Sequence, residues 1–222
     1  MGVLHDLPYA RLEAKYVTDI TGGKLYANSE ARESVYKSES GKYDIIHLAM
    51  HTLLNENDPM LSTLIFSKLN DSTQDGYLKM YEIYGIPLRA KMVVLSSCNT
   101  GTGVLFSGEG ILSLARGFIF SGSQSVVMSM WEIEDKSGTE VVEMFYKNLM
   151  KGYTKSVALK KARTSFLENS DRLRSHPYFW STLVVYGNNA SLYHSYKLKI
   201  GIAIVAFLAL GLVIYSWKRR DS

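Results

Sequence analysis

The stretch YDIIHLAMH, residues 43–51, decides the fold class. Its first seven residues form a short apolar run, which is typical of a strand covered on both faces. Three similar runs follow, at residues 92–96 (MVVLS), 125–129 (SVVMS) and 182–186 (TLVVY). Segments with helical periodicity alternate with these runs, at residues 9–21, 108–120, 137–150 and 154–168. This alternation predicts an α/β domain whose sheet is mostly parallel.

A polar run interrupts the pattern between the first two predicted strands. Residues 70–76 (NDSTQDG) separate two short apolar segments, 64–66 and 76–78. Turn-forming residues between two short strands predict a surface hairpin.

Charge is divided unevenly along the 222 residues. The net charge is +4, but the last 27 residues hold five of the positive charges and one of the negative charges, so the first 195 residues carry twenty of each sign. A nucleic-acid-binding domain would need a basic surface on its folded part. The sequence therefore predicts no nucleic-acid partner. With one cysteine, an intrachain disulfide and a cysteine-rich zinc site are both excluded.

The C-terminal segment of the chain is predicted to be a membrane anchor. Residues 200–217 (IGIAIVAFLALGLVIYSW) contain no charge, and a helix of that length spans about 27 Å, close to the thickness of a bilayer core. We therefore predict a domain over residues 1–190, a juxtamembrane linker over 191–199, one transmembrane helix over 200–217 and a basic tail over 218–222. Three positive charges after the span favour a cytoplasmic tail, whereas residues 1–10 show no signal peptide, so the side of the soluble domain stays open.

Two residues that can do chemistry follow predicted strands. His51 lies just past the first strand and Cys98 lies two residues past the second. Ligand sites of open parallel sheets form at the carboxyl ends of the strands, so both side chains are expected at the same rim. A neighbouring imidazole raises the thiolate fraction of a cysteine, which makes this a nucleophile and base pair. The alternative for Cys98 is a small buried hydrophobic residue.

The other histidines are interpreted as structural. His47 lies about 13 Å from His51 along a strand, too far for both to bind one ion, so no metal site is expected. Its apolar surroundings predict a core histidine held by a hydrogen bond. His176 precedes a proline and three aromatic residues, which indicates packing. The glycines after Cys98 complete neither a dinucleotide-binding fingerprint nor a phosphate-binding loop, so no cofactor is expected.

Taken in order, these segments resemble the CHAT domain, a caspase-like family related to separase and often found behind tetratricopeptide repeats. The similarity extends from about residue 7 to residue 187, with matching segments at 7–10 (LPYA), 44–51 (DIIHLAMH), 94–101 (VLSSCNTG), 108–110 (GEG), 114–116 (LAR), 129–131 (SMW), 145–146 (FY), 158–159 (AL) and 176–180 (HPYFW), together with Glu13 and Asp135.

The resemblance implies a caspase-like three-layer sandwich and cysteine peptidase chemistry on a protein or peptide substrate. By position, Cys98 is the nucleophile and His51 the general acid/base. The backbone N–H groups of Cys98 and Thr52 would form the oxyanion hole. Trp131, with Glu132 and Asp135, would contribute to a substrate pocket, and the two carboxylates are equally well explained as loop or helix N-terminal charges.

The chain departs from the family at three points, and two of them, Thr52 and the missing first strand, support a second hypothesis. Thr52 stands where the family usually has glycine, and threonine resists a positive φ. Asn99 stands where Glu or Gln is usual. The strand that usually precedes residue 7 is expected to be missing, which leaves a gap in the sheet or requires a partner chain to fill it. The repeats that usually recruit or restrain the domain are expected in a regulatory partner or in a missing upstream segment. The chain is therefore predicted to be either a membrane-anchored cysteine endopeptidase or a catalytically inactive interaction module at the membrane.

Overall fold

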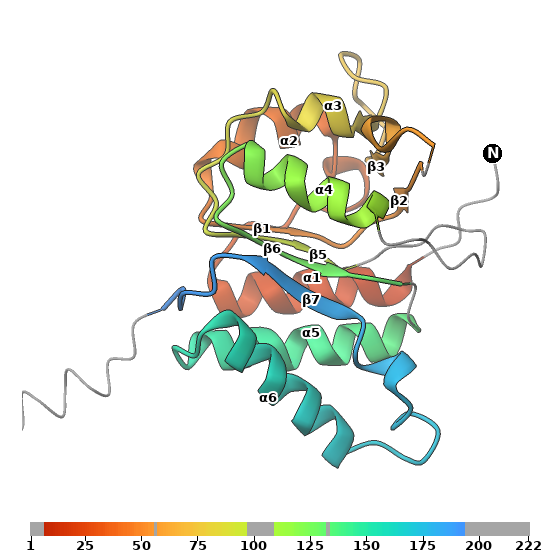
Figure 1. Cartoon of the computed structure of the whole chain (residues 1–222). Coiled ribbons are helices and arrows are strands. Elements are labelled where there is room, and N and C mark those ends of the chain that lie inside the picture. The colour runs from red at the N-terminus through yellow and green to blue at the C-terminus, as the bar shows by residue number, and fades with distance from the viewer. Residues whose placement is uncertain (1–6, 56, 97–108, 132–133, 194–222) are drawn as a thin grey trace, which may run out of the picture.

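A computed structural model of the chain describes residues 7–55, 57–96, 109–131 and 134–193. Its central sheet has the strand order β1-β5-β6-β7 (Figure 1). The strands are β1 (Ile45–Leu48), β5 (Met92–Leu95), β6 (Ser125–Ser129) and β7 (Leu183–Gly187). β1, β5 and β6 run parallel and β7 is antiparallel to β6. All four predicted strands and the mostly parallel sheet are confirmed.

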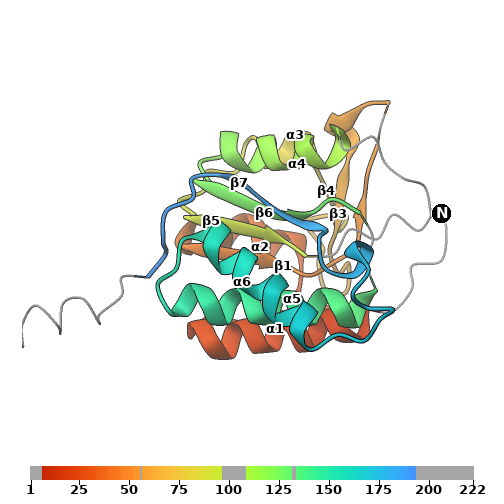
Figure 2. The ribbon, with the colours of Figure 1, turned by 60° about the horizontal axis from the view of Figure 1, so that its bottom comes forward.

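Helices cover both faces of this sheet (Figures 1 and 2). One layer contains α1 (Pro8–Thr21), α5 (Asp135–Met150) and α6 (Lys155–Glu168), and the other contains α2 (Glu33–Glu39), α3 (Met80–Ile83) and α4 (Glu109–Phe120). Each layer has its own hydrophobic core against the sheet. The four helices expected from periodicity are present, whereas the prediction missed α2 and α3.

The central strands are apolar because both of their faces are buried. Every residue of β5 and of β6 is buried, including the serines at both ends of β6. On α5, Val141, Val142, Phe145 and Leu149 form an apolar stripe that packs into the core of its layer. Burial of this kind supplies the main favourable free energy of folding.

A small second sheet follows β1. It consists of β2 (Thr52–Leu53), β3 (Thr63–Ile65) and β4 (Tyr77–Lys79), with antiparallel pairing throughout. The predicted hairpin is thus confirmed as β3 and β4. Short 3₁₀ helices complete the described chain: η1 (Asn28–Glu30), η2 (Ser40–Lys42), η3 (Pro59–Leu61) and η4 (Pro177–Phe179).

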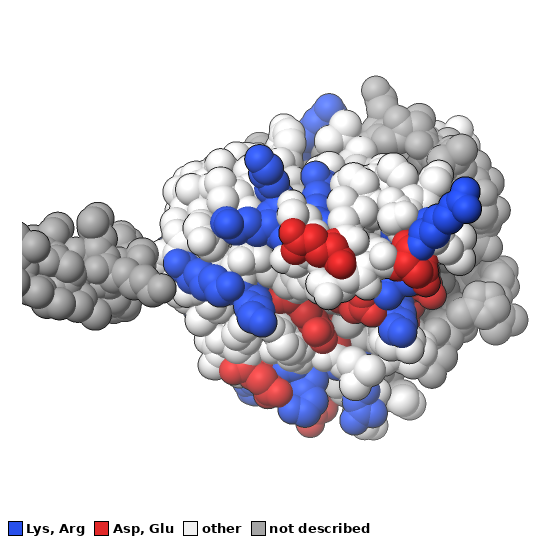
Figure 3. Space-filling view, turned by 90° about the horizontal axis from the view of Figure 1, so that it is seen from below, with Lys and Arg blue, Asp and Glu red and all other residues white. Residues whose placement is uncertain are grey.

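The face formed by α1, α5 and α6 carries charges of both signs (Figure 3). Pairs such as Lys15–Asp19 and Arg174–Glu140 lie there. The candidate transmembrane segment, residues 200–217, lies outside the described residues. Within the described ranges, no helix combines the length and the apolar character needed to cross a bilayer.

Candidate functional site

His51 lies at the carboxyl end of β1, three residues after Leu48 and immediately before β2. Its carbonyl oxygen accepts a hydrogen bond from the Ile65 N–H of β3, at 3.1 Å. The residue is half-buried. The turn between the two sheets therefore holds the His51 backbone at the rim where the site was expected.

Cys98 lies outside the described residues, but the strand that leads to it is placed. In the parallel pairing of β1 and β5, Leu48 is opposite Leu95. His51 and Cys98 each follow these paired residues by three positions. In the sequence, His51 and Cys98 therefore follow neighbouring parallel strands at the same end of the sheet, each three residues after one member of the Leu48–Leu95 pair.

Ser96, the last described residue before Cys98, is held from both sides. Its N–H donates to the Leu48 carbonyl at 3.3 Å, and its carbonyl accepts from the Ser129 hydroxyl at 2.9 Å. Ser96 and Ser129 are both buried. The base of the segment that carries Cys98 is therefore fixed between β1 and β6, a contact that the sequence prediction did not include.

Thr52 is a strand residue. It is opposite Leu64 of β3, and the Ile65 N–H bonds to the His51 carbonyl, so Thr52 belongs to a non-hydrogen-bonded pair of the ladder. Its N–H consequently points away from β3. Among the described residues other than glycine, positive φ occurs at Asn28 and Asn70, so Thr52 does not adopt the backbone conformation that threonine resists.

His47 is a core histidine, as predicted. Its Nε2 lies 2.8 Å from Glu13 Oε1 and its Nδ1 lies 3.2 Å from the Tyr146 hydroxyl. The Thr139 hydroxyl donates to the other Glu13 oxygen at 3.2 Å. Burial, and then the Glu13 carboxylate, raise the pKa of Tyr146 well above its ordinary value, so Tyr146 stays a neutral hydroxyl. We name His47, Glu13, Tyr146 and Thr139 the buried polar network.

The sequence of the chain matches the family model of the CHAT domain over residues 2–188. The chain belongs to the CHAT domain family. It is also similar to tetratricopeptide repeat protein 28 of Homo sapiens and of Mus musculus, with 24% identity over 233 aligned positions in each case. The alignment covers 91% of this chain and 9% of each relative. The chain thus spans about a tenth of the length of these curated relatives.

The predicted substrate-pocket residues of this CHAT domain take different positions. The Trp131 indole N–H donates to the Tyr178 carbonyl at 3.1 Å, which attaches the end of β6 to the segment before β7. Asp135 begins α5 and accepts a hydrogen bond from the Tyr9 N–H at 3.0 Å. Glu132 lies outside the described residues. Asp135 thus has a structural contact between α1 and α5, and the contribution of all three residues to a pocket stays a prediction.

Within the described ranges, the CHAT domain has no group of three or more His, Cys, Asp or Glu side chains placed to hold a metal ion. His176 is placed structurally: its Nδ1 accepts from the Tyr178 N–H at 3.3 Å and caps η4. Neither observation adds a candidate catalytic residue to the predicted pair of His51 and Cys98.

Two features of the CHAT domain were missed. Glu13 was named for its family match and not as the partner of His47, although it shares the buried face of α1 with Ala10 and Val17. That i, i+3, i+7 spacing is the signal that could have located it. Ser129 gave no comparable signal, because a serine at a strand end is ordinary.

If the chain cleaves peptides, as the resemblance implies, Ser129→Ala should lower the cleavage rate by about three- to tenfold, because the Ser96 carbonyl loses the hydroxyl that holds it. The substrate KM should change less than kcat, because the Ser129 hydroxyl bonds to Ser96 at the base of the segment that carries Cys98. Steady-state kinetics with a fluorogenic peptide measure both values. Ser123→Ala, which removes another buried hydroxyl at the opposite end of β6, is the matched control. Equal losses in the two variants would assign the effect to general stability.

Proposed function

We propose that this CHAT domain is a cysteine endopeptidase in which Cys98 is the nucleophile and His51 the general acid/base. The observation that supports the proposal is the parallel register of β1 and β5, which delivers both residues past the same sheet end at equal offset. Ser96, two residues before Cys98 in the sequence, is fixed between β1 and β6. A nucleophile and its base need a position within hydrogen-bond reach of each other.

The proposed reaction follows from these two groups. His51 takes the proton of the Cys98 thiol, and the thiolate attacks the scissile carbonyl carbon. The carbonyl oxygen gains negative charge, which the N–H groups of Cys98 and Thr52 would stabilise. His51 then gives its proton to the leaving amine, and the C–N bond breaks to leave a thioester. Water, deprotonated by His51, hydrolyses the thioester and restores the thiol.

The Thr52 N–H supports the oxyanion step. The β2–β3 ladder does not use it, so it is directed away from β3, and Thr52 itself is buried. Removal of one such donor from a peptidase costs about 10²- to 10³-fold in kcat. The donor comes from the backbone, so threonine can supply it as glycine does.

A positional library of internally quenched peptides tests the function directly. Full-length protein is expected to cleave a restricted subset of the library, with a preference set by the residue before the scissile bond. A basic preference would favour Glu132 and Asp135 as specificity residues. Absence of cleavage across the library, with and without a repeat-containing partner, would contradict the endopeptidase proposal.

A second candidate function is an interaction module without turnover. The observation that favours it is the position of β1 at one end of the sheet in the described part of the chain, which leaves a backbone edge able to bind a partner. In that case the protein would bind its partner with the same affinity before and after substitution of Cys98. The endopeptidase proposal requires turnover that Cys98 controls.

We also propose that residues 200–217 anchor the domain in a membrane as a single span. The uncharged run and its basic flanks support this localisation. The expressed protein is expected to stay with the membrane pellet after extraction at alkaline pH, and deletion of residues 196–222 is expected to release it. Recovery of the intact chain in the alkaline supernatant would contradict the anchor. Digestion of sealed vesicles by added protease then gives the side on which the domain lies.

Regulation by tetratricopeptide repeats is a further part of the proposal. The two curated relatives carry these repeats in their name, and the present chain matches 9% of their length. We propose that a repeat-containing segment or partner protein restrains or recruits the domain. The peptide assay with added repeat protein measures the effect as a change in kcat/KM.

A further inference from the structure

The amino ends of the three parallel strands lie at one end of the domain, opposite the rim of the candidate site. Two backbone hydrogen bonds join the segments that precede these strands: the Lys91 N–H donates to the Asp44 carbonyl at 2.7 Å, and the Gln124 N–H donates to the Ala90 carbonyl at 2.9 Å. The Asn188 N–H, just after β7, donates to the Gln124 carbonyl at 2.8 Å. In Figure 1, this end of the sheet lies on the left, whereas β2 and β3 lie on the right. Strand β7 therefore leads the chain away from the rim.

A buried lysine fixes the chain at the point where it leaves β7. Lys155, at the start of α6, is 1% exposed, and its Nζ donates to the Asn188 carbonyl at 3.0 Å and to the Ala190 carbonyl at 2.9 Å. The Ser191 hydroxyl donates at 3.0 Å to the carbonyl of Gly152, which lies between α5 and α6. Residues 188–191 are thus held against the body of the domain at the end opposite the rim.

The surface at this end, which we name the amino-end face, carries an excess of positive charge. It consists of the connections that lead into and out of the strands and helices there, residues 22–24, 39–44, 84–91, 120–124, 150–154 and 188–193. These residues include five Lys or Arg side chains and two acidic ones, whereas residues 1–195 as a whole carry equal numbers of both. On the side of the molecule shown in Figure 3, several Lys and Arg side chains lie on the left, toward this end. The rest of the domain therefore has an excess of negative charge.

Both acidic side chains of the amino-end face already have a cation. The Lys42 Nζ lies 2.6 Å from a Glu39 carboxylate oxygen, and the Lys91 Nζ lies 3.0 Å from an Asp44 carboxylate oxygen. Exposed pairs of this kind leave little net charge on their four members. The positive charge of the face therefore comes from its three other cations.

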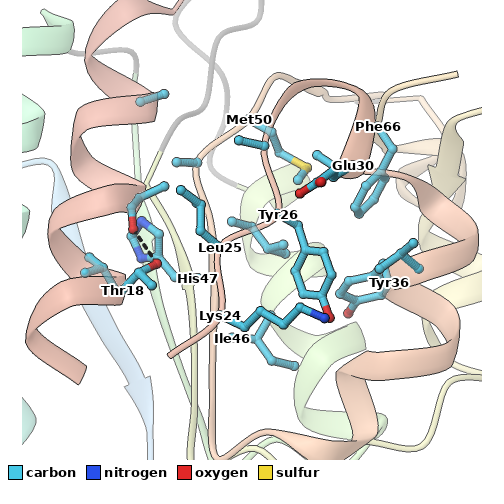
Figure 4. A pocket seen from close by; sticks show the side chains of 18 of the residues that line it. Thr18, Lys24, Leu25, Tyr26, Glu30, Tyr36, Ile46, His47, Met50 and Phe66 are labelled. Carbon is cyan, nitrogen blue, oxygen red and sulfur yellow. Dashed lines mark hydrogen bonds between the residues drawn. The ribbon is translucent and has the colours of Figure 1, made fainter. Parts of the chain in front are cut away.

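Those three cations, Lys24, Arg89 and Lys151, are exposed and form no ion pair among the described residues. The Lys24 ammonium lies 4.6 Å from the centroid of the Tyr26 ring, and Figure 4 shows these two side chains beside each other. Phe120, on the same face, is 72% exposed. Cations beside aromatic and apolar side chains are typical of a protein surface that meets lipid headgroups.

We propose that the amino-end face lies on anionic headgroups of the membrane, so that the candidate site at the opposite rim faces away from the bilayer and receives its substrate from the aqueous phase. This inference rests on the anchor proposed for residues 200–217. Six residues separate that run from Tyr193, the last described residue. A connection of six residues spans at most about 20 Å, whereas a compact domain of this length is about 40 Å across. An anchored domain can therefore bring the amino-end face to the bilayer, but not the rim.

Charge decides between the orientations that the connection allows. An anionic leaflet attracts Lys and Arg side chains within a Debye length, about 10 Å, of its surface. The amino-end face holds the positive excess of the domain, and every other side belongs to a part with a negative excess. A bilayer with anionic lipid therefore favours a domain that stands on this face.

Quenching by lipid measures which end of the domain lies at the bilayer. Gln124→Cys on the amino-end face and Asn57→Cys on the exposed loop after β2 each receive a fluorophore in the full-length Cys98→Ala protein. The protein is reconstituted in vesicles that contain a lipid with a quencher on its headgroup. With about 30% phosphatidylserine, the label at position 124 is expected to be quenched at least about threefold more than the label at position 57. An increase in salt from about 0.1 M to about 0.5 M is expected to reduce this difference.

Substitution of the three unpaired cations tests the role of charge. The triple variant is expected to lose at least about half of the quenching that phosphatidylserine adds at position 124, and it consists of Lys24→Gln, Arg89→Gln and Lys151→Gln. The matched control removes the same charge from exposed positions outside the amino-end face and should keep this quenching; it consists of Lys68→Gln, Lys136→Gln and Arg172→Gln.

Extraction of the same vesicles at alkaline pH separates this inference from the anchor on which it rests. Recovery of the intact chain in the supernatant would overturn the anchor and the orientation with it. Retention in the membrane with equal quenching at the two positions, or with stronger quenching at position 57, would overturn the orientation and leave the anchor in place. Quenching at position 124 that phosphatidylserine does not change, or that both triple variants reduce equally, would overturn the contact with anionic headgroups.

Discussion

Cys98→Ala is expected to abolish peptide cleavage, with a fall in kcat of at least about 10³-fold, because the proposed reaction forms its acyl intermediate on the Cys98 thiol. The variant should also lose labelling by acyl probes directed at thiols, since Cys98 is the one cysteine of the chain. Affinity for an uncleaved substrate should stay within about threefold of the starting value. Initial rates and probe labelling, measured on the same preparations, check both parts.

His51→Gln is expected to reduce kcat nearly as far, because the thiol loses the base that ionises it. Effects of two groups that act as a unit do not add, so the double variant should be no slower than Cys98→Ala alone. Ser97→Ala, next to the nucleophile, is the matched control and should keep most of the activity. Cleavage that survives in Cys98→Ala at more than about a tenth of the original rate would refute the assignment of the nucleophile.

Glu13→Leu is expected to destabilise the domain by about 3 kcal/mol, the second large effect. The Glu13 carboxylate accepts hydrogen bonds from both sides of the buried polar network, and its removal leaves His47 and Thr139 without these partners. Glu13→Gln keeps an acceptor in place and should cost about 1 kcal/mol. Urea unfolding followed by tryptophan fluorescence measures the free energy of unfolding of each variant.

Lys15→Ala is the matched control on the same helix. Its exposed salt bridge with Asp19 is worth at most about 1 kcal/mol, as surface ion pairs generally are. A loss for Glu13→Leu no larger than that of Lys15→Ala would show that the network contributes little to stability. A loss of about 3 kcal/mol with full activity per folded molecule would show that the network supports the fold and not the chemistry.

The central sheet was predictable because strands that are buried on both faces have a recognisable sequence pattern. Runs such as MVVLS and SVVMS are apolar without alternation, and the structure buries every residue of β5 and β6. The sequence of residues 33–39 (ESVYKSE), with its charged residues, has no comparable pattern from which the helix α2 could have been predicted. That helix is stabilised by contacts distant in sequence, among them the Ser34 N–H with the Asp71 carboxylate.

The candidate site was predictable in part. The rule that parallel strands deliver their following residues to one rim predicted that His51 lies past the carboxyl end of β1, where the structure has it, and its catalytic role with Cys98 stays a prediction. Contacts between distant segments were not predictable: nothing near Ser129 in the sequence indicates its bond to Ser96, and the spacing of Glu13 with Ala10 and Val17 indicates a buried position without identifying His47 as its partner. The concern over Thr52 came from its residue type; the structure shows that Thr52 is a strand residue without a positive φ, and its part in an oxyanion hole stays a prediction.

The distance between the Cys98 sulfur and the nearer His51 ring nitrogen, in a crystal structure with a peptide aldehyde bound to the thiol, tests the proposed pair most directly. We predict a separation of about 3–4 Å, with the inhibitor oxygen within about 3 Å of the Thr52 nitrogen. A separation beyond about 7 Å, with the two side chains on different faces of the sheet, would contradict the pair and the reaction proposed for it.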